Sequence, residues 1–369
     1  MNIPVWEEAL REAGLSDEYA DVLLGFKHRF NQGIPEHVVG SERWFTPENH
    51  LSEDKAREDI KNGIKQELKA NRMFGPFKHK ELVFHFDFFR SNPLGDVVNG
   101  DGKIRPINDL LFPRNDPVIR SVNSFVDKKD FTTTWDNYNT VFKFFAKLEE
   151  KYELALFDWE KAYRQIPTHV SQWQYLLWKD FNGDLLLDTC ITFGGVAGCV
   201  SFGRPADAWK NVMEFKFNQL EEVFQWVDDN LFIRTQGATV SMQSVLQVSA
   251  ALGVKTNEKK FLEFSNEQKF INFVWNGRRK TVRLPDGKIE ESIAQIQVTA
   301  RKAGSDGPIQ PWHLATKFEF VLDSLGGPAP KFELDGCIQC KLRCDHPSQH
   351  CWQFIEWPPG HHQKTHYET

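Results

Sequence analysis

The residues best suited to chemistry in this sequence are three aspartates that adjoin apolar, strand-like segments. Asp228 and Asp229 are adjacent in FQWVDDNLFIR, with apolar residues before and after them. Because Asp-Asn pairs favour tight turns, we predict a hairpin that carries both acids at its tip. Asp158, in LALFDWEKAYRQIP, follows another apolar strand and precedes a short helix, so its carboxylate should leave a strand end. Taken alone, the Asp-Asp-Asn stretch also fits a solvated turn.

Three carboxylates on two neighbouring strands form an oxygen-rich site that suits Mg²⁺, and buried adjacent carboxylates need such compensation. Two ions about 3.5–4 Å apart clamp the attacking and leaving oxygens of an in-line phosphoryl displacement. We therefore predict that Asp158, Asp228 and Asp229 bind two Mg²⁺ ions, or Mn²⁺ in their place. The carboxylates of Asp158 and Asp228 should then lie within about 8 Å of each other.

The elements around these acids predict an α+β fold in four parts. Residues 1–58 form a helical lead-in, 59–135 a region that has short strand-like runs at 77–130, 136–294 strands backed by helices, and 295–369 an irregular tail. The local predictions are helices at 5–14 and 17–30, a helix from 52 that stops at 75–76, a hairpin turning at 99–102, a short helix at 160–166, a glycine-rich loop at 191–207, a helix at 206–223 and one strand at 269–275.

Composition narrows the class of protein. The chain has 369 residues and is 40% hydrophobic, which is ample for a sizeable core. No apolar run approaches the roughly 20 residues that cross a bilayer, and the first residues do not resemble a signal peptide. We therefore expect an intracellular protein without a membrane partner. A formal net charge of −6 argues against tight non-specific binding of nucleic acid, but not against an enzyme with a locally basic channel.

The spacing of these residues resembles that of the reverse transcriptase family. Asp158 with Tyr163, then Phe193-Gly194, then the WVDD sequence that ends in Asp229, follow the order of motifs A, B and C. Upstream, NPLG and KIRPIND resemble the fingers hairpin, and downstream GVKTNEKK and FINF resemble motif D and the primer grip. The phrases FPRNDP, SVNS and AYRQIP are most similar to polymerases of tyrosine-recombinase (DIRS-type) retrotransposons. The resemblance covers roughly residues 45–290.

The resemblance implies a right-hand polymerase fold with fingers at 59–135 and a palm at 136–294. The palm would have an antiparallel sheet backed by helices, and the thumb would be reduced or absent. The implied activity is that of an RNA-directed DNA polymerase, which transfers deoxynucleotides from deoxynucleoside triphosphates to a primer 3′-hydroxyl. Its partners would be an RNA or DNA template with a primer.

The same resemblance implies roles for individual residues. The three acids hold the metal ions, Tyr163 rejects the 2′-hydroxyl of ribonucleotides, and Lys259 or Lys260 protonates the leaving pyrophosphate. The implied nucleotide-binding residues are Lys103, Arg105, Tyr163, Phe193, Gly194, Lys259 and Lys260. The implied primer-grip residues are Phe270, Ile271, Asn272 and Phe273.

Other interpretations stay open for several of these positions. Arg105 also fits a surface charge, Tyr163 a core aromatic, Gly194 a plain loop residue, and Lys259 and Lys260 a solvated turn. The VVNG sequence before the fingers turn lacks the lysines that often stand there, which predicts weaker affinity for the triphosphate.

The tail supports a second kind of site and other functions. Cys337, Cys340, His346 and Cys351 are potential zinc ligands, although their spacing differs by one residue from the retroelement zinc knuckle. An unordered tail is the alternative. Two other functions therefore remain: an inactive relict or domesticated nucleic-acid-binding protein with the same fold, and a zinc-dependent interaction protein.

Overall fold

A computed structural model of the chain describes residues 1–40, 42–50, 53–98, 104–114, 116–147, 150–288 and 320–321, with the backbone alone at 53–56, 97–98, 105 and 320–321. The chain divides into two compact units. The first comprises Met1–Ile271 and Asn276–Arg279, and the second comprises Asn272–Trp275 and the chain from Lys280. All three acids belong to the first unit. The boundaries predicted at residues 58, 135 and 294 stay predictions.

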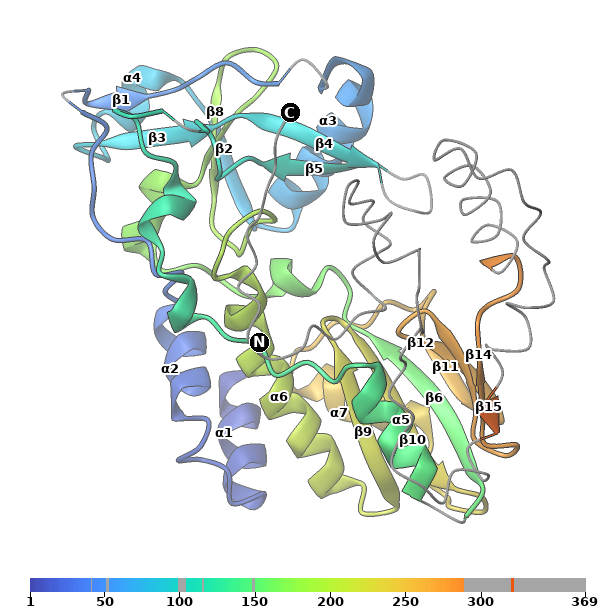
Figure 1. The fold of residues 1–369 in the computed structure, drawn as a ribbon. Helices are drawn as coiled ribbons and strands as arrows, with labels where there is room; N and C mark the ends of the chain where they lie inside the picture. Colours follow the sequence, from blue (N-terminus) through green and yellow to red (C-terminus); the bar gives the residue numbers. More distant parts are fainter. Residues whose placement is uncertain are drawn as a thin grey trace, which may run out of the picture. The chain divides into compact units, whose positions relative to one another are not determined.

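The first unit mixes helices with several sheets, so the α+β prediction is confirmed (Figure 1). Its α-helices are α1 (Ile3–Glu12), α2 (Ala20–His28), α3 (Glu53–Lys69), α4 (His79–Leu82), α5 (Tyr138–Lys147), α6 (Gly198–Lys216) and α7 (Met242–Ala251). Its 3₁₀ helices are η1 (Val122–Phe125), η2 (Lys128–Asp130), η3 (Ala162–Gln165) and η4 (Val170–Tyr175). Its strands are β1 (Trp44–Phe45), β2 (Met73–Phe77), β3 (Phe89–Asn92), β4 (Leu94–Val98), β5 (Ile104–Asn108), β6 (Tyr152–Asp158), β7 (Leu177–Lys179), β8 (Leu185–Asp188), β9 (Leu220–Trp226), β10 (Asp229–Thr235), β11 (Leu262–Ser265) and β12 (Glu267–Phe270).

The acids lie on a four-stranded sheet in the order β11-β6-β10-β9, with every neighbouring pair antiparallel. Helices α1, α2, α6 and α7 contribute to a core that includes β6, β9 and β10 (Figure 1). Within this core Trp209 of α6 packs against Phe157 and Phe232, with ring centroids 4.5 and 5.8 Å away. Because strand side chains alternate between faces, the neighbour of Phe157, Asp158, is turned away from this core.

A second sheet has the order β1-β3-β7-β8-β2 and mixes parallel with antiparallel pairs. Ile60 and Ile64 of α3 pack in one cluster with Met73 and Leu186 of this sheet. Strands β4 and β5 pair antiparallel from Leu94–Asn108 to Val98–Ile104, which confirms the predicted hairpin. Its turn at 99–102 lies outside the described residues.

Several local predictions need correction. The helix that begins near 52 ends at Lys69, and Gly75-Pro76 lies within β2 instead of at the helix end. Helix α6 begins at Gly198, so it takes in the second half of the predicted glycine-rich loop, including Pro205. Buried Phe202 and Ala206 anchor this turn of α6 in the core, and such packing overrides weak helix propensity. The predicted helix at 160–166 is only the 3₁₀ helix η3.

The strand predicted over 269–275 is interrupted. It divides into β12 and β13 (Phe273–Asn276), and both residues between them, Ile271 and Asn272, have positive φ. Most of β13 belongs to the second unit, where β14 (Thr281–Arg283) and β15 (Phe320–Val321) pair antiparallel. The tail cysteines and histidine proposed as zinc ligands lie outside the described residues. Among the residues that are described, no helix is long and apolar enough to cross a membrane.

Candidate active site

The three acids meet at one end of the four-stranded sheet. Asp158 is the last residue of β6, and the β6–β10 register pairs it directly with Asp229, the first residue of β10. One carboxylate oxygen from each of Asp158, Asp228 and Asp229 can be chosen so that all three lie within 4.8 Å of one another. This separation is inside the predicted 8 Å limit. Asp158 is buried, with 2% of its surface exposed, whereas Asp228 and Asp229 are half-buried.

The hairpin tip differs in detail from the prediction. The turn consists of Val227 and Asp228, while Asp229 already pairs with Trp226 and Asn230 is buried in β10. Val227 has a φ of 54°, which is rare and strained for a β-branched residue. The turn is held by hydrogen bonds from the Trp159 amide (3.0 Å) and the Asn230 side chain (3.1 Å) to the Asp228 carbonyl.

Lys260 neutralises part of this acidic cluster. Its Nζ lies 2.6 Å from Asp158 Oδ2 and 3.4 Å from Asp229 Oδ1. Burial and the neighbouring Asp229 and Asp228 raise the pKa of Asp158 to about 7, although Lys260 acts in the opposite direction. Burial alone would lower the pKa of Lys260, but its contacts with the acids raise it above the ordinary value.

The donor set fits divalent metal ions. It consists of carboxylate oxygens alone, which are ligands of Mg²⁺ and Mn²⁺. The ammonium group between Asp158 and Asp229 marks the position where positive charge is stabilised by this cluster. Asp158, Asp228 and Asp229 are therefore the residues that would hold the ions.

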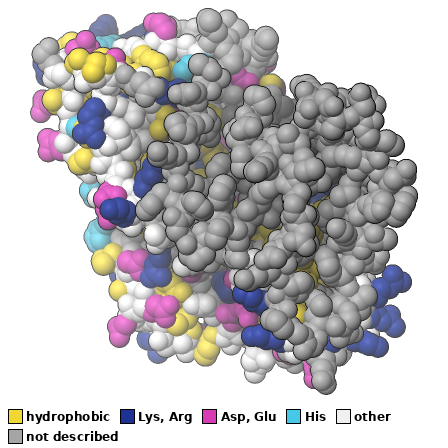
Figure 2. All heavy atoms as spheres, viewed as in Figure 1, with side chains coloured by type: hydrophobic (Ala, Val, Ile, Leu, Met, Phe, Trp, Pro, Cys, Tyr) yellow, Lys and Arg dark blue, Asp and Glu magenta, His cyan; other side chains and the backbone are white. Residues whose placement is uncertain are grey.

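The acids open onto a cavity of about 940 Å³, which is large enough for a nucleotide. Asp158 and Asp228 line it together with Lys259, Lys260 and residues of η3. Its opposite wall comes from α3 and β5, through Gly63, Ile64, Glu67 and Pro106. Outside the cavity, Figure 2 shows basic and acidic side chains interspersed over the described part of the face it views.

Two aromatic residues predicted to bind the nucleotide also line this cavity. Tyr163 of η3 packs against Phe193, with ring centroids 5.3 Å apart, and its hydroxyl lies 3.0 Å from Cys199 Sγ. Burial and Cys199 raise the pKa of Tyr163 well above its ordinary value. Gly194 follows with a φ of 101°, and a Cβ there would lie 2.9 Å from the carbonyl oxygen of Asn108. Glycine is therefore required by the close approach of this segment to β5.

For the other predicted site residues the structure shows no contact that identifies a role, and their roles stay predictions. Lys103 and the side chain of Arg105 lie outside the described residues. Lys259 is exposed at the cavity. Phe270 and Ile271 are buried in the first unit, whereas Asn272 and Phe273 belong to the second unit.

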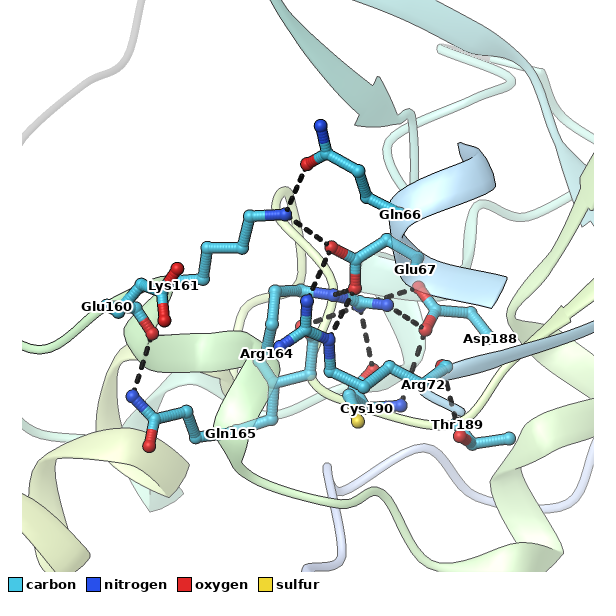
Figure 3. Close-up of polar contacts among 11 residues, drawn as sticks. Gln66, Glu67, Arg72, Glu160, Lys161, Arg164, Gln165, Asp188, Thr189 and Cys190 are labelled. Atoms are coloured by element: carbon cyan, nitrogen blue, oxygen red, sulfur yellow. Dashed lines mark hydrogen bonds and ion pairs between the residues drawn. The ribbon is translucent and has the colours of Figure 1, made fainter. Parts of the chain in front are cut away.

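Sequence reasoning missed a group of charged residues beside the cavity. Arg164 of η3 forms two hydrogen bonds to Asp188 (2.7 and 2.9 Å) and one to Glu67 of α3 (3.0 Å) (Figure 3). Lys161 contacts Glu67 in turn and lines the cavity together with Glu67 and Arg164. The sequence offered only a weak signal: Arg164 stands near the apolar Ala162 and Ile166, but its partners Glu67 and Asp188 are 97 and 24 positions away.

Comparisons with known proteins give matches of fold only. No protein-family model matches the sequence, and no curated protein sequence matches it. The chain is similar to the foamy viral protease-reverse transcriptase in complex with RNA/DNA hybrid, with 16% identity and a TM-score of 0.48 over 79% of this chain and 37% of that chain. The foamy viral protease-reverse transcriptase in complex with double-stranded DNA gives 17% identity and a TM-score of 0.46, over 79% of this chain and 57% of that chain. The native prototype foamy virus protease-reverse transcriptase gives 15% identity and a TM-score of 0.44, over 74% of this chain and 34% of that chain. The chain thus spans from a third to little more than half of these proteins.

Proposed function

We propose that this chain is an RNA-directed DNA polymerase that adds deoxynucleotides to the 3′-hydroxyl of a primer. The observation that carries the proposal is the direct pairing of Asp158 with Asp229 beside Asp228, with Asp158 and Asp228 lining a cavity of about 940 Å³. The five sequence motifs in order add support, including the similarity to polymerases of DIRS-type retrotransposons. In this proposal residues 59–135 are the fingers and 136–294 the palm.

The three acids would hold two Mg²⁺ ions, which when bound supply charge stabilisation to the attacking and leaving oxygens of the phosphoryl transfer. The residues of the chain do the rest by positioning. Tyr163 and Phe193 form an apolar wall for the sugar and base, and Lys260 Nζ carries a proton close to where the pyrophosphate would leave. Lys103 and Arg105 are proposed to contact the triphosphate.

Primer extension on poly(rA)·oligo(dT), with Mg²⁺ and then Mn²⁺, tests this function. We expect extension by the wild type and a loss of about a thousandfold or more in Asp228→Asn, since that change removes one metal-binding carboxylate. Asp17→Asn is the matched control, because Asp17 is exposed and does not line the cavity. Absence of extension by folded wild-type protein would contradict the proposal and favour an inactive nucleic-acid-binding protein.

A further inference from the structure

The charged residues beside the cavity form a connected cluster from three elements. We call it the Glu67 cluster; it consists of Glu67 of α3, Arg72, Lys161, Arg164 and Asp188 of β8. Figure 3 shows the Glu67 carboxylate surrounded by all three cations. Arg72 binds it through two hydrogen bonds of 2.8 and 3.0 Å, and Arg164 and Lys161 each contact it at 3.0 Å.

The cluster holds one positive charge in excess, since three cations face two carboxylates. Among the described residues, no other carboxylate lies within ion-pair distance of these cations. Arg164 is committed to Asp188, whose side chain is fully buried, and only 7% of the Arg164 side chain is exposed. The excess charge therefore belongs to the cation that can leave the cluster while both carboxylates keep a cationic partner.

That cation is Lys161. Its side chain is 37% exposed, against 16% for Arg72, and an ion pair of this exposure is weakened by solvent. If Lys161 moves, Glu67 keeps the two arginines. Lys161 also lines the cavity that contains Asp158 and Lys259, and its side chain reaches across from the start of η3 to Gln66 and Glu67 of α3 (Figure 3).

We propose that Lys161 binds the polyphosphate of a nucleoside triphosphate in this cavity, by exchanging Glu67 for a phosphate oxygen. This inference rests on the proposed polymerase function and names a subsite for its substrate. Of the other cations that line the cavity, Lys260 is engaged by the acids and Arg164 by Asp188, so a triphosphate would meet Lys161 together with the exposed Lys259. A lysine ammonium suits this role, since it is a mobile charge with three donors.

Equilibrium binding to the full-length protein tests the proposal, with tripolyphosphate, dTTP and thymidine as three separate probes at one fixed Mg²⁺ concentration. We expect Lys161→Met to weaken tripolyphosphate and dTTP about ten- to thirtyfold and to leave thymidine unchanged, because only the phosphate contact is lost. Lys161→Arg should retain most of the affinity. Lys69→Met is the control, as Lys69 is exposed at the end of α3 and does not line the cavity.

The proposal is overturned if Lys161→Met binds tripolyphosphate as tightly as the wild type does, or if it weakens thymidine as much as tripolyphosphate. The binding result is also independent of catalysis. A wild type that extends primers while Lys161→Met keeps its phosphate affinity refutes the subsite and leaves the polymerase function standing. Lysine-dependent binding without any extension by the wild type supports the subsite and refutes the polymerase function.

Discussion

Asp158 and Asp229 are direct partners across the β6–β10 strand pair, and Lys260 Nζ contacts both carboxylates. The site is therefore built by strand register. A slip of one residue would turn one of the two carboxylates to the opposite face of the sheet. The core pair Phe157–Phe232 opposes such a slip, since the same shift of β10 would turn Phe232 away from the core that it shares with Phe157.

The first prediction concerns metal binding without catalysis. Mn²⁺ should raise the free energy of unfolding of the wild type, by about 2.7 kcal/mol at a concentration one hundred times the dissociation constant. Thermal melts in EDTA and in rising Mn²⁺ measure this shift. Asp228→Asn should show a much smaller rise, and Asp17→Asn a normal one. Equal shifts in all three proteins would show that the stabilising ion binds elsewhere.

The second prediction concerns sugar selection by Tyr163, whose ring lies against Phe193 and Phe202 beside the cavity. Tyr163→Ala should raise the ratio of kcat/KM for ribonucleotides to that for deoxynucleotides about tenfold or more, because the ring no longer fills the space of a 2′-hydroxyl. Tyr163→Phe keeps the ring and loses only the contact with Cys199, so its ratio should stay near that of the wild type. Single-nucleotide extension kinetics with both substrates measure the ratio. An unchanged ratio in Tyr163→Ala would assign the tyrosine to the core.

The third prediction concerns the contribution of the buried Arg164–Asp188 pair of the Glu67 cluster to stability. Asp188→Asn leaves the buried charge of Arg164 without its main partner and should lower the free energy of unfolding by about 3 kcal/mol. The double change Arg164→Leu with Asp188→Leu should cost less than the single change. Urea denaturation gives both values. Asp21→Asn, which breaks the exposed pair with Arg204, is the control and should change stability by about 0.5 kcal/mol or less. A similar small effect in Asp188→Asn would mean that Arg164 finds another partner.

The sequence predicted the acidic site because its signals are local. An apolar run followed by Asp158, and a second pair of apolar runs around Asp228 and Asp229, indicate the strand ends on their own. The Glu67 cluster could not be predicted in this way, because Arg164 meets Glu67 across 97 positions of the chain. Glu67 lies on α3 and Arg164 on η3, and only the tertiary fold brings these two elements together. Helix α6 was mispredicted for a similar reason, since its first turns depend on burial against the core and not on their own propensity.

A fourth prediction follows from Glu214 of α6, which is half-buried and accepts a hydrogen bond from the Val223 amide at 3.2 Å. Burial raises the pKa of Glu214 from 4.5 to about 7; the nearby Lys210 opposes this rise and Glu222 adds to it. The folded protein therefore binds more protons at this residue than the unfolded chain does between these two pH values. Stability from Glu214 is fully present below pH 4.5 and is lost as the pH rises through about 7.

Glu214→Gln should remove this pH dependence, because the amide mimics the protonated acid and its carbonyl oxygen can still accept from Val223. We expect the variant to exceed the wild type in free energy of unfolding by about 1–2 kcal/mol near pH 8, and to match it near pH 4.5. Urea denaturation across this pH range measures the difference. Glu221→Gln on β9 is the matched control, because Glu221 is exposed and should give a nearly constant difference. A constant difference in Glu214→Gln as well would place the titrating group elsewhere in the fold.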